Sequence, residues 1–442
     1  MEHVDSLICA RWVVPVEPGG AVLAGHAVVV NHGRIVAVAP EIQARARFTA
    51  DEYIERPNHV LLPGLINAHT HAAMALLRGA AESASFETWS EHQIKPREQR
   101  WMDAEYVRDG AELAIADMLT SGTTCFADMH LFPEIVAEAA AAARMRACIG
   151  LPVGGAPGVW ASSEDDYFTK GLELRDEYAN DPLITTALSP YSPGSLSDAT
   201  LLRMRRNADE IDLPVILRVH ESRSESRGRF QGETPPDGER TLVRLQRLGL
   251  LSPLLCAVHM VHATESDLDL AAAGGISIAH CPQSNLKLGN GICPVAAIRS
   301  RGINLALGTA GAASNNDLSM LDEMRTAALL ERGLSAGAST MSAHDWLQAA
   351  TLNAAKALGM GDVIGSIVPG KWADLCCIDL NRAHTQPVYD PAAQVLYAAS
   401  RDQVSDVWVA GRTLVTAGRL TRMDLDDIVE RAGRWQQRIA SS

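Results

Sequence analysis

Short apolar runs alternate with longer amphipathic stretches through the middle of the chain. Runs this short and rich in Val, Ile and Ala predict buried strands, and the longer stretches predict helices. The predicted strands are residues 60–66, 123–129, 147–152, 184–189, 215–219, 256–259, 277–280 and 304–308. The clearest predicted helices are residues 104–121, 133–143, 198–207, 239–247 and 265–273. Eight strands interleaved with helices predict a (β/α)8 TIM barrel of the α/β class.

The two ends of the chain have a different pattern, with short strands joined by tight turns. Residues 27–30 and 34–38 predict a hairpin around Gly33, and residues 373–380 and 404–410 predict further strands. A lone hairpin cannot bury its own faces, so we expect both ends to build one domain. The predicted domains are a composite β-sandwich of residues 1–60 plus 365–442, and the barrel with the active site at residues 61–364.

Composition narrows the classes of function. The chain has 442 residues, 47% hydrophobic and 21% charged, which is typical of a globular protein. A formal net charge of −14 argues against nucleic acid as a partner and favours a small-molecule substrate. No apolar run has the length of a membrane span, and the first 20 residues do not resemble a signal peptide, so we expect a cytoplasmic protein without a membrane partner. Eight cysteines without a CxxC motif suit reduced, buried thiols.

Polar side chains gather where the predicted barrel strands end. His69 and His71 follow the first strand, Arg218 and Glu221 end the fifth, and His259 ends the sixth. The C-terminal ends of barrel strands are where catalytic groups collect. Residues i and i+2 share a strand face, so the two imidazoles of His69 and His71 could bind one metal. A pair of histidines that simply caps a strand is the alternative.

Several longer strings carry a resemblance that the histidine pair alone does not. They are PGLINAHTHAAMALLRG (63–79), SGTTCFADM (121–129), HCPQSNLKLGNG (280–291), GAASNNDL (311–318) and IGSIVPGKWADL (364–375). Together they resemble the amidohydrolase superfamily, in particular the branch of triazine hydrolases and of methylthioadenosine and S-adenosylhomocysteine deaminases. The resemblance implies a (β/α)8 barrel with a β-sandwich built from both termini. It also implies one divalent metal, zinc or iron, that activates a water to displace ammonia or another leaving group from a heterocycle.

The chain departs from this family at two of the four implied metal ligands. His69 and His71 match the first pair, but Arg218 stands where the third ligand is a histidine, and Ala310 where the fourth is an aspartate. A guanidinium has no lone pair to donate and stays protonated, so it repels a divalent metal. We therefore expect no cofactor, with zinc or iron only if the residual site at His69 and His71 still binds. Arg218 would supply the missing positive charge, by pairing with Glu221 or by holding an anionic substrate group.

Other residues match the family's catalytic and substrate positions. Glu221 and His259 correspond to the residues that transfer protons, although a salt bridge to Arg218 is the alternative for Glu221. The resemblance assigns substrate contacts to Glu87 and Trp89, with a plain surface helix as the alternative for Glu87. Tyr191 replaces a histidine of the substrate-contacting loop, which predicts altered ring recognition.

Further polar residues near the strand ends are expected to support the site. His130 is expected to be an exposed rim residue, and His220 to pack behind the site. His280 and Asn285 are expected to buttress the loop after the seventh strand, and Asp317 to order its own loop.

Three functions remain open on the sequence. The first is an amidohydrolase-like enzyme acting on a nucleoside or nitrogen heterocycle, with a degenerate metal site and metal-independent or altered chemistry. The second is a metal-dependent aminohydrolase, an adenosine-type or triazine deaminase, with a modified ligand set. The third is a non-catalytic protein that binds a nucleoside. In each case the resemblance implies a homodimer or a larger homo-oligomer.

Overall fold

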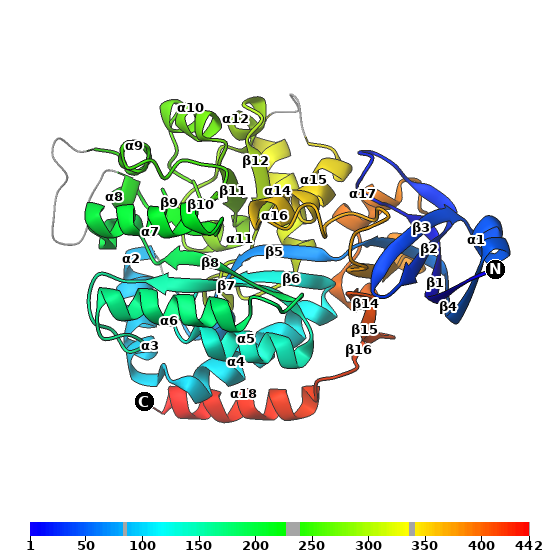
Figure 1. Ribbon diagram of the computed structural model, residues 1–442, viewed down its shortest axis with the longest axis horizontal. Helices are drawn as coiled ribbons and strands as arrows, with labels where there is room; N and C mark the ends of the chain where they lie inside the picture. Colours follow the sequence, from blue (N-terminus) through cyan, green and yellow to red (C-terminus); the bar gives the residue numbers. More distant parts are fainter. Residues whose placement is uncertain (83–85, 227–238, 336–340, 442) are drawn as a thin grey trace.

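The computed structural model describes residues 1–82, 86–226, 239–335 and 341–441, and places them around two separate sheets (Figure 1). Eight parallel strands form the first sheet, each hydrogen-bonded to the next in chain order. They are β5 (Leu65–Thr70), β6 (Thr123–Asp128), β7 (Arg146–Val153), β8 (Ile184–Pro190), β9 (Val215–Val219), β10 (Leu255–His259), β11 (Ser277–His280) and β12 (Asn304–Leu307). Nearly every residue in them is buried, as expected for strands covered on both faces.

The first and last of these strands meet, so the sheet is a nearly closed barrel. The backbone N–H of Ala310, just after β12, donates to the carbonyl of His69 in β5 at 2.9 Å. The side chains of Asn67 and Thr309 bridge the same seam, with the Asn67 amide donating to Thr309 Oγ1 at 2.7 Å. The predicted barrel is confirmed.

Helices lie along the chain between the barrel strands. The longer ones begin at side-chain caps, where Asp103, Ser163, Ser197 and Thr264 each accept a backbone N–H of the first turn. The helices of the barrel region are α2 (Phe86–Thr88), α3 (Lys95–Trp101), α4 (Ala104–Thr120), α5 (Pro133–Ala143), α6 (Glu164–Glu177), α7 (Asp198–Glu210), α8 (Arg223–Ser226), α9 (Thr241–Arg247), α10 (Glu265–Gly274), α11 (Pro282–Lys287), α12 (Val295–Ser300), α13 (Ala312–Asn315), α14 (Met320–Leu334), α15 (Ala343–Ala349) and α16 (Leu352–Ala357). In the described part of the chain, none of the helices has the length and apolar character needed to span a membrane.

The second sheet is mixed, has eight strands and comes from both chain ends. Its order is β16-β15-β14-β13-β4-β1-β2-β3, with β1 and β4 parallel and the other pairs antiparallel. The strands are β1 (Glu2–Val13), β2 (Leu23–Asn31), β3 (Arg34–Pro40), β4 (Phe48–Pro63), β13 (Leu375–Asp379), β14 (Val404–Val409), β15 (Arg412–Thr416) and β16 (Arg419–Leu420). The helices of the two ends are α1 (Glu41–Arg47), α17 (Pro391–Tyr397) and α18 (Leu425–Ala440), of which α18 packs along α4 (Figure 1). The composite β-domain is thus present, and its boundaries at residues 60 and 365 stay a prediction.

One predicted strand is wrong in its extent. The apolar run 60–66 spans two strands of two sheets, because β4 ends at Pro63 and β5 begins at Leu65. Gly64 lies between them, and a Cβ there would come within 2.0 Å of Thr124 Oγ1. The chain passes from the terminal sheet into the barrel at this residue, so His69 lies inside its strand and not beyond it.

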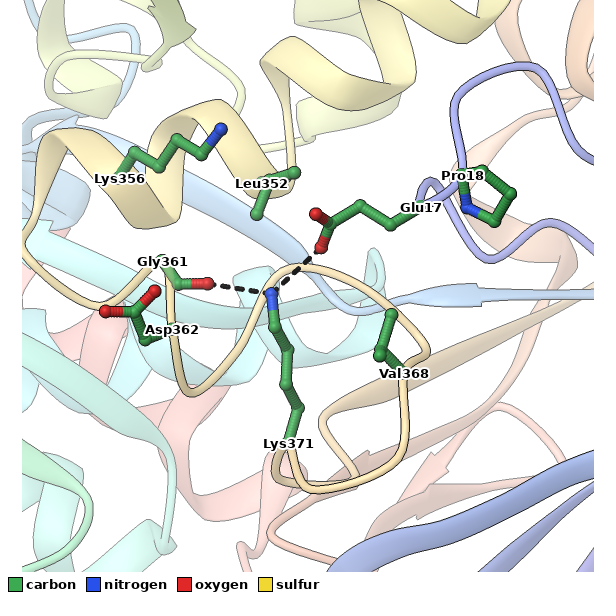
Figure 2. Close-up of a pocket in the computed structure, with 8 residues that line it drawn as sticks. All are labelled: Glu17, Pro18, Leu352, Lys356, Gly361, Asp362, Val368 and Lys371. Carbon is green, nitrogen blue, oxygen red and sulfur yellow. Dashed lines mark hydrogen bonds and ion pairs between the residues drawn. The ribbon is translucent and has the colours of Figure 1, made fainter.

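A buried ion pair and the hydrogen bonds of a lysine join the terminal segments to the barrel region. Arg146, at the start of β7, forms a bidentate pair with Asp374 at 2.6 and 3.1 Å, and both side chains are buried. Lys371 donates to Glu17 Oε2 at 3.1 Å and to the Gly361 carbonyl at 2.7 Å, beside a surface cleft of about 400 Å³ (Figure 2). These contacts fix the terminal sheet against the barrel.

Candidate functional site

Three histidines lie together at the C-terminal ends of the barrel strands. The ring centroid of His69 lies 4.9 Å from that of His71 and 5.8 Å from that of His259. All three side chains are buried. Burial lowers the pKa of His69 and of His71 well below the usual value, and nearby Arg218 lowers both further. Burial also lowers the pKa of His259.

The hydrogen bonds of these rings leave donor and acceptor atoms available. His71 Nδ1 lies 2.5 Å from the Met129 carbonyl oxygen, so Nδ1 carries the proton and Nε2 keeps its lone pair. Both ring nitrogens of His69 are buried, and neither has a hydrogen-bond partner in the described part of the chain. A buried imidazole without partners at the strand ends, next to His71 and His259, is consistent with a site for a group that the chain itself does not supply.

The loop after β12 is packed directly against the histidine pair. A Cβ at Gly308 would lie 2.8 Å from the backbone nitrogen of His69, and a Cβ at Gly311 would lie 3.0 Å from His71 Cβ. Ala310 lies between these glycines and has φ +56°, a left-handed conformation that costs alanine about 1 kcal/mol and that Asp and Asn adopt more readily. The backbone at this position thus suits an aspartate better than the alanine it carries.

Arg218 projects from β9 into this cluster. It occupies the position that matches the third metal ligand of the family. Its Nη1 lies 3.5 Å from Glu221 Oε2, and its Nε donates to the Tyr191 carbonyl at 3.2 Å. The guanidinium carbon lies 3.8 Å from the centre of the Tyr191 ring, a cation–π contact. Arg218 therefore places a fixed positive charge beside His69 and His71. Both expected roles of this residue, pairing with Glu221 and holding an anionic substrate group, require such a charge.

Glu221, His259 and Asn285 form a chain of polar contacts. Glu221 Oε1 lies 3.5 Å from His259 Nε2, and His259 Nδ1 lies 3.0 Å from Asn285 Oδ1. With the amide oxygen as acceptor, Nδ1 carries the proton and Nε2 faces the carboxylate. The arrangement suits the transfer of a proton between Glu221 and His259.

His130 is not the exposed rim residue that the sequence suggested. Its side chain is only 6% exposed, and its Nε2 lies 3.2 Å from Glu98 Oε1 on α3. Burial opposes its protonation, but the contact with Glu98 raises the pKa of His130. Its ring centroid lies 6.1 Å from that of His71, so this ion pair borders the cluster.

Four non-glycine residues near these strand ends have a left-handed backbone, as do others elsewhere in the described chain. His220, His259, Met260 and Ala310 all have positive φ, between +50° and +77°. His220 and Met260 directly follow a barrel strand, His259 ends one, and Ala310 lies three residues after β12. Strain of this kind persists where a functional arrangement requires it.

The substrate residues predicted by resemblance lie in different surroundings. Tyr191, after β8, is 58% exposed and covers Arg218. Glu87 is exposed on α2, and Trp89 is buried at the start of a π-helical segment, in ring contact with Phe86. In the described part of the chain, no hydrogen bond or ring contact joins Glu87 or Trp89 to the histidine cluster.

The structure also shows the surroundings of the residues that we expected to support the site. His220 is buried, with Nε2 3.8 Å from Asp267 Oδ1, and His280 is buried beside the strand-seven loop. Asp317 accepts the Ser319 backbone N–H at 2.8 Å, which orders its own loop.

Sequence reasoning missed Glu98 and the role of Asn285. Glu98 is one of several charged residues on a short helix, and nothing in its spacing distinguishes it from a surface glutamate. Asn285 lies in a motif that was assigned to loop support, whereas the structure places its amide against His259.

The donor atoms of the site do not fit the four-ligand metal centre that the resemblance implies. His69 and His71 supply two nitrogen donors, but Arg218 brings a fixed positive charge and Ala310 brings no donor. Among the described residues, no three His, Cys, Asp or Glu side chains are placed to hold a metal ion. Two imidazoles next to a guanidinium are a poor cation site.

Comparison with known proteins supports the fold and the family. The model of the amidohydrolase family matches residues 60–414. A 5-methylthioadenosine/S-adenosylhomocysteine deaminase from Teredinibacter turnerae is 42% identical over 99% of this chain and 98% of its own length. The equivalent protein of Saccharophagus degradans is 40% identical over 98% of this chain and 97% of its own.

Solved structures agree with this result. An adenosine deaminase from Xanthomonas campestris, determined with bound zinc, superposes with a TM-score of 0.96 at 45% identity, and the match covers both chains completely. An atrazine chlorohydrolase from Arthrobacter aurescens, complexed with zinc, superposes with a TM-score of 0.89 over 98% of this chain and 100% of its own, at 24% identity, which supports the fold alone.

Proposed function

This chain belongs to the amidohydrolase family, as a hydrolase of C–N bonds or a derivative of one, and we propose that it acts on a purine nucleoside or related nitrogen heterocycle. The substrate class is that of its relatives, 5-methylthioadenosine and S-adenosylhomocysteine, whose deaminases match it over nearly the full chain. A cytoplasmic location and a homodimer or larger homo-oligomer stay predictions.

The observation that carries this proposal is the polar chain Glu221–His259–Asn285 at the strand ends. Glu221 accepts a proton from the water that attacks the ring carbon and returns it to the departing amine. His259, oriented by Asn285, exchanges that proton with Glu221 or donates to the substrate. Arg218 holds a positive charge next to the carboxylate throughout, because a guanidinium stays protonated.

We derive no step through a metal, because the donor set does not fit one. In a metal-dependent deaminase the metal lowers the pKa of bound water from 15.7 to about 7, which supplies hydroxide at neutral pH. Without that activation the same proton-transfer residues give a slower reaction. We therefore propose slow hydrolysis or altered chemistry at a degenerate metal site.

The test measures turnover of 5-methylthioadenosine, S-adenosylhomocysteine and adenosine, with ammonia release as the readout. Glu221→Gln removes the proton acceptor at nearly constant shape and is expected to lower turnover by roughly 10²–10⁴-fold while binding is retained. Glu430→Gln, on the exposed face of α18, is the matched control and should leave turnover unchanged. Turnover that survives Glu221→Gln would contradict the assigned role.

A second function, nucleoside binding without turnover, is favoured by Arg218 and Ala310 at two ligand positions. Calorimetry separates the two. A nucleoside that binds with micromolar affinity but releases no ammonia over days supports the binding function.

A further inference from the structure

We propose that Arg218, with His69, forms a binding site for a carboxylate carried by the ligand on or next to its ring. The inference rests on the proposed function, because it concerns the same site and refines its substrate class from a nitrogen heterocycle to one that carries a carboxylate. The guanidinium then stands where the family's resemblance places a metal, and recognises an anion there.

Arg218 has few partners for an arginine so deeply placed. Only 12% of its side chain is exposed. Its hydrogen bond to the Tyr191 carbonyl is 3.2 Å long and its ion pair with Glu221 3.5 Å, and the more distant Glu98 carboxylate adds only electrostatic attraction. Buried Arg146 in the same chain has a bidentate carboxylate, Asp374, at 2.6 and 3.1 Å. A buried guanidinium normally has such a partner, because an unpaired buried charge costs several kcal/mol.

The unpaired edge of Arg218 is the edge that binds carboxylates. The ring of Tyr191 covers one face of the guanidinium, and Nε is bonded to the Tyr191 carbonyl. The hydrogen bond and the ion pair of Arg218 with described residues use Nε and Nη1, and neither of them uses Nη2. The N–H groups in the guanidinium plane present a fork whose spacing matches the two oxygens of a carboxylate.

Glu221 does not fill this role. Its Oε2 lies 3.5 Å from Arg218 Nη1, and its Oε1 lies 3.5 Å from His259 Nε2, so the carboxylate is shared between two partners and bonds neither closely. A bidentate pair has N–O distances of about 2.7–2.9 Å. Glu221 therefore leaves the guanidinium fork available.

His69 supplies a second, independent sign of an absent acceptor. Its side chain is fully buried, and both of its ring nitrogens lack a partner in the described residues. An imidazole carries at least one N–H in either protonation state, so at least one buried donor is left without an acceptor. A carboxylate oxygen bound by Arg218 is an acceptor of the required kind, whereas a metal cation would be repelled by the guanidinium.

The experiment compares two matched pairs of small ligands by calorimetry: nicotinate with nicotinamide, and orotate with uracil. Acetate is added as a further probe, to separate recognition of a carboxylate on a ring from recognition of any carboxylate. We expect each ring carboxylate to bind at least ten-fold more tightly than its neutral partner, and more tightly than acetate. Equal affinity within both pairs, or no binding of either carboxylate at 10 mM, would overturn the proposal.

Variants assign the preference to Arg218. In Arg218→Gln the preference for the carboxylate should fall to less than two-fold, and in Arg218→Lys it should be partly retained, because a point charge remains without the fork. Arg247→Gln, an exposed arginine on α9, is the control and should bind as the natural protein does. If Arg218→Gln fails to fold by circular dichroism, Arg218→Lys still decides, since an unchanged preference there excludes fork recognition. A preference that persists in Arg218→Gln would place the carboxylate elsewhere.

These experiments distinguish a failure of the carboxylate-site proposal from a failure of the proposed function. If neutral nucleosides bind or turn over while the carboxylates show no advantage, the proposed function stands and this inference fails. If a carboxylate binds through Arg218 and no nucleoside binds or turns over, the inference on the anion site holds and the nucleoside proposal fails.

Discussion

The combined substitution Arg218→His with Ala310→Asp, here called the ligand-restored variant, should convert the site into a metal centre. It replaces the guanidinium by an imidazole and adds a carboxylate beside His69 and His71. The backbone accepts the second change well, because residue 310 already has φ +56°, and Asp tolerates this conformation better than Ala. Gly308 and Gly311, which neither substitution changes, allow the close approach of the loop to the histidine pair.

The size of the expected effect follows from linkage. Zinc at 100-fold above its dissociation constant stabilises a protein that binds it only when folded by about 2.7 kcal/mol. At roughly 2 °C per kcal/mol, a conservative value for a large domain, the melting temperature should rise by about 5 °C. Without the restored ligands the natural chain should gain less than about 1 °C under the same conditions.

The assay is differential scanning calorimetry with and without zinc, on the natural chain, both single variants and the ligand-restored variant. Arg218→His alone still lacks the carboxylate, and Ala310→Asp alone still carries the guanidinium, so both should respond weakly. The ligand-restored variant should also release ammonia from adenosine-type substrates faster than the natural chain. A ligand-restored variant that zinc does not stabilise, or a natural chain stabilised equally, would refute the assignment of these two positions.

Three further predictions concern orientation, stability and pH. Asn285→Ala removes the partner of His259 Nδ1, a hydrogen bond worth about 1 kcal/mol, and should lower kcat about five-fold with little change in KM, measured by steady-state kinetics. Asp374→Asn removes the charge that pairs with Arg146 and should lower the free energy of unfolding by about 3–5 kcal/mol in urea titrations, against less than 0.5 kcal/mol for a surface control. Burial raises the pKa of Glu323 to about 8, so the folded state retains a proton that the unfolded chain releases, and stability should fall as pH rises from about 4.5 through 8, by up to 1.4 kcal/mol per pH unit from this group. Glu323→Gln should flatten that part of the profile, and an unchanged slope would show that other groups cause it.

The barrel could be predicted from sequence because its strands are short, apolar and separated by helices with clear caps. The predicted strand 215–219 matches β9, and the predicted strand 277–280 matches β11. The prediction of a single strand over residues 60–66 was wrong, because hydrophobicity alone does not mark the point at which a chain leaves one sheet and enters another. That change occurs at Gly64, where the close approach of Thr124, 60 residues later in the chain, leaves no room for a side chain.

The candidate site could be predicted in part for a similar reason. His69, His71, Arg218, Glu221 and His259 stand at strand ends, and a parallel barrel brings all its strand ends to one face. The pairing of Glu98 with His130 could not be predicted, because a helix contributes Glu98 and its orientation depends on packing. The left-handed backbone at Ala310 was equally hidden, since alanine gives no sign of positive φ in the sequence.

The central claim is that the guanidinium of Arg218 has taken the place of a metal. Elemental analysis by mass spectrometry, on the natural chain and the ligand-restored variant purified side by side without chelators, tests it most directly. We expect zinc and iron far below one equivalent per chain in the natural protein, and close to one equivalent in the ligand-restored variant. One equivalent of zinc or iron per natural chain, lost on His69→Ala, would contradict it.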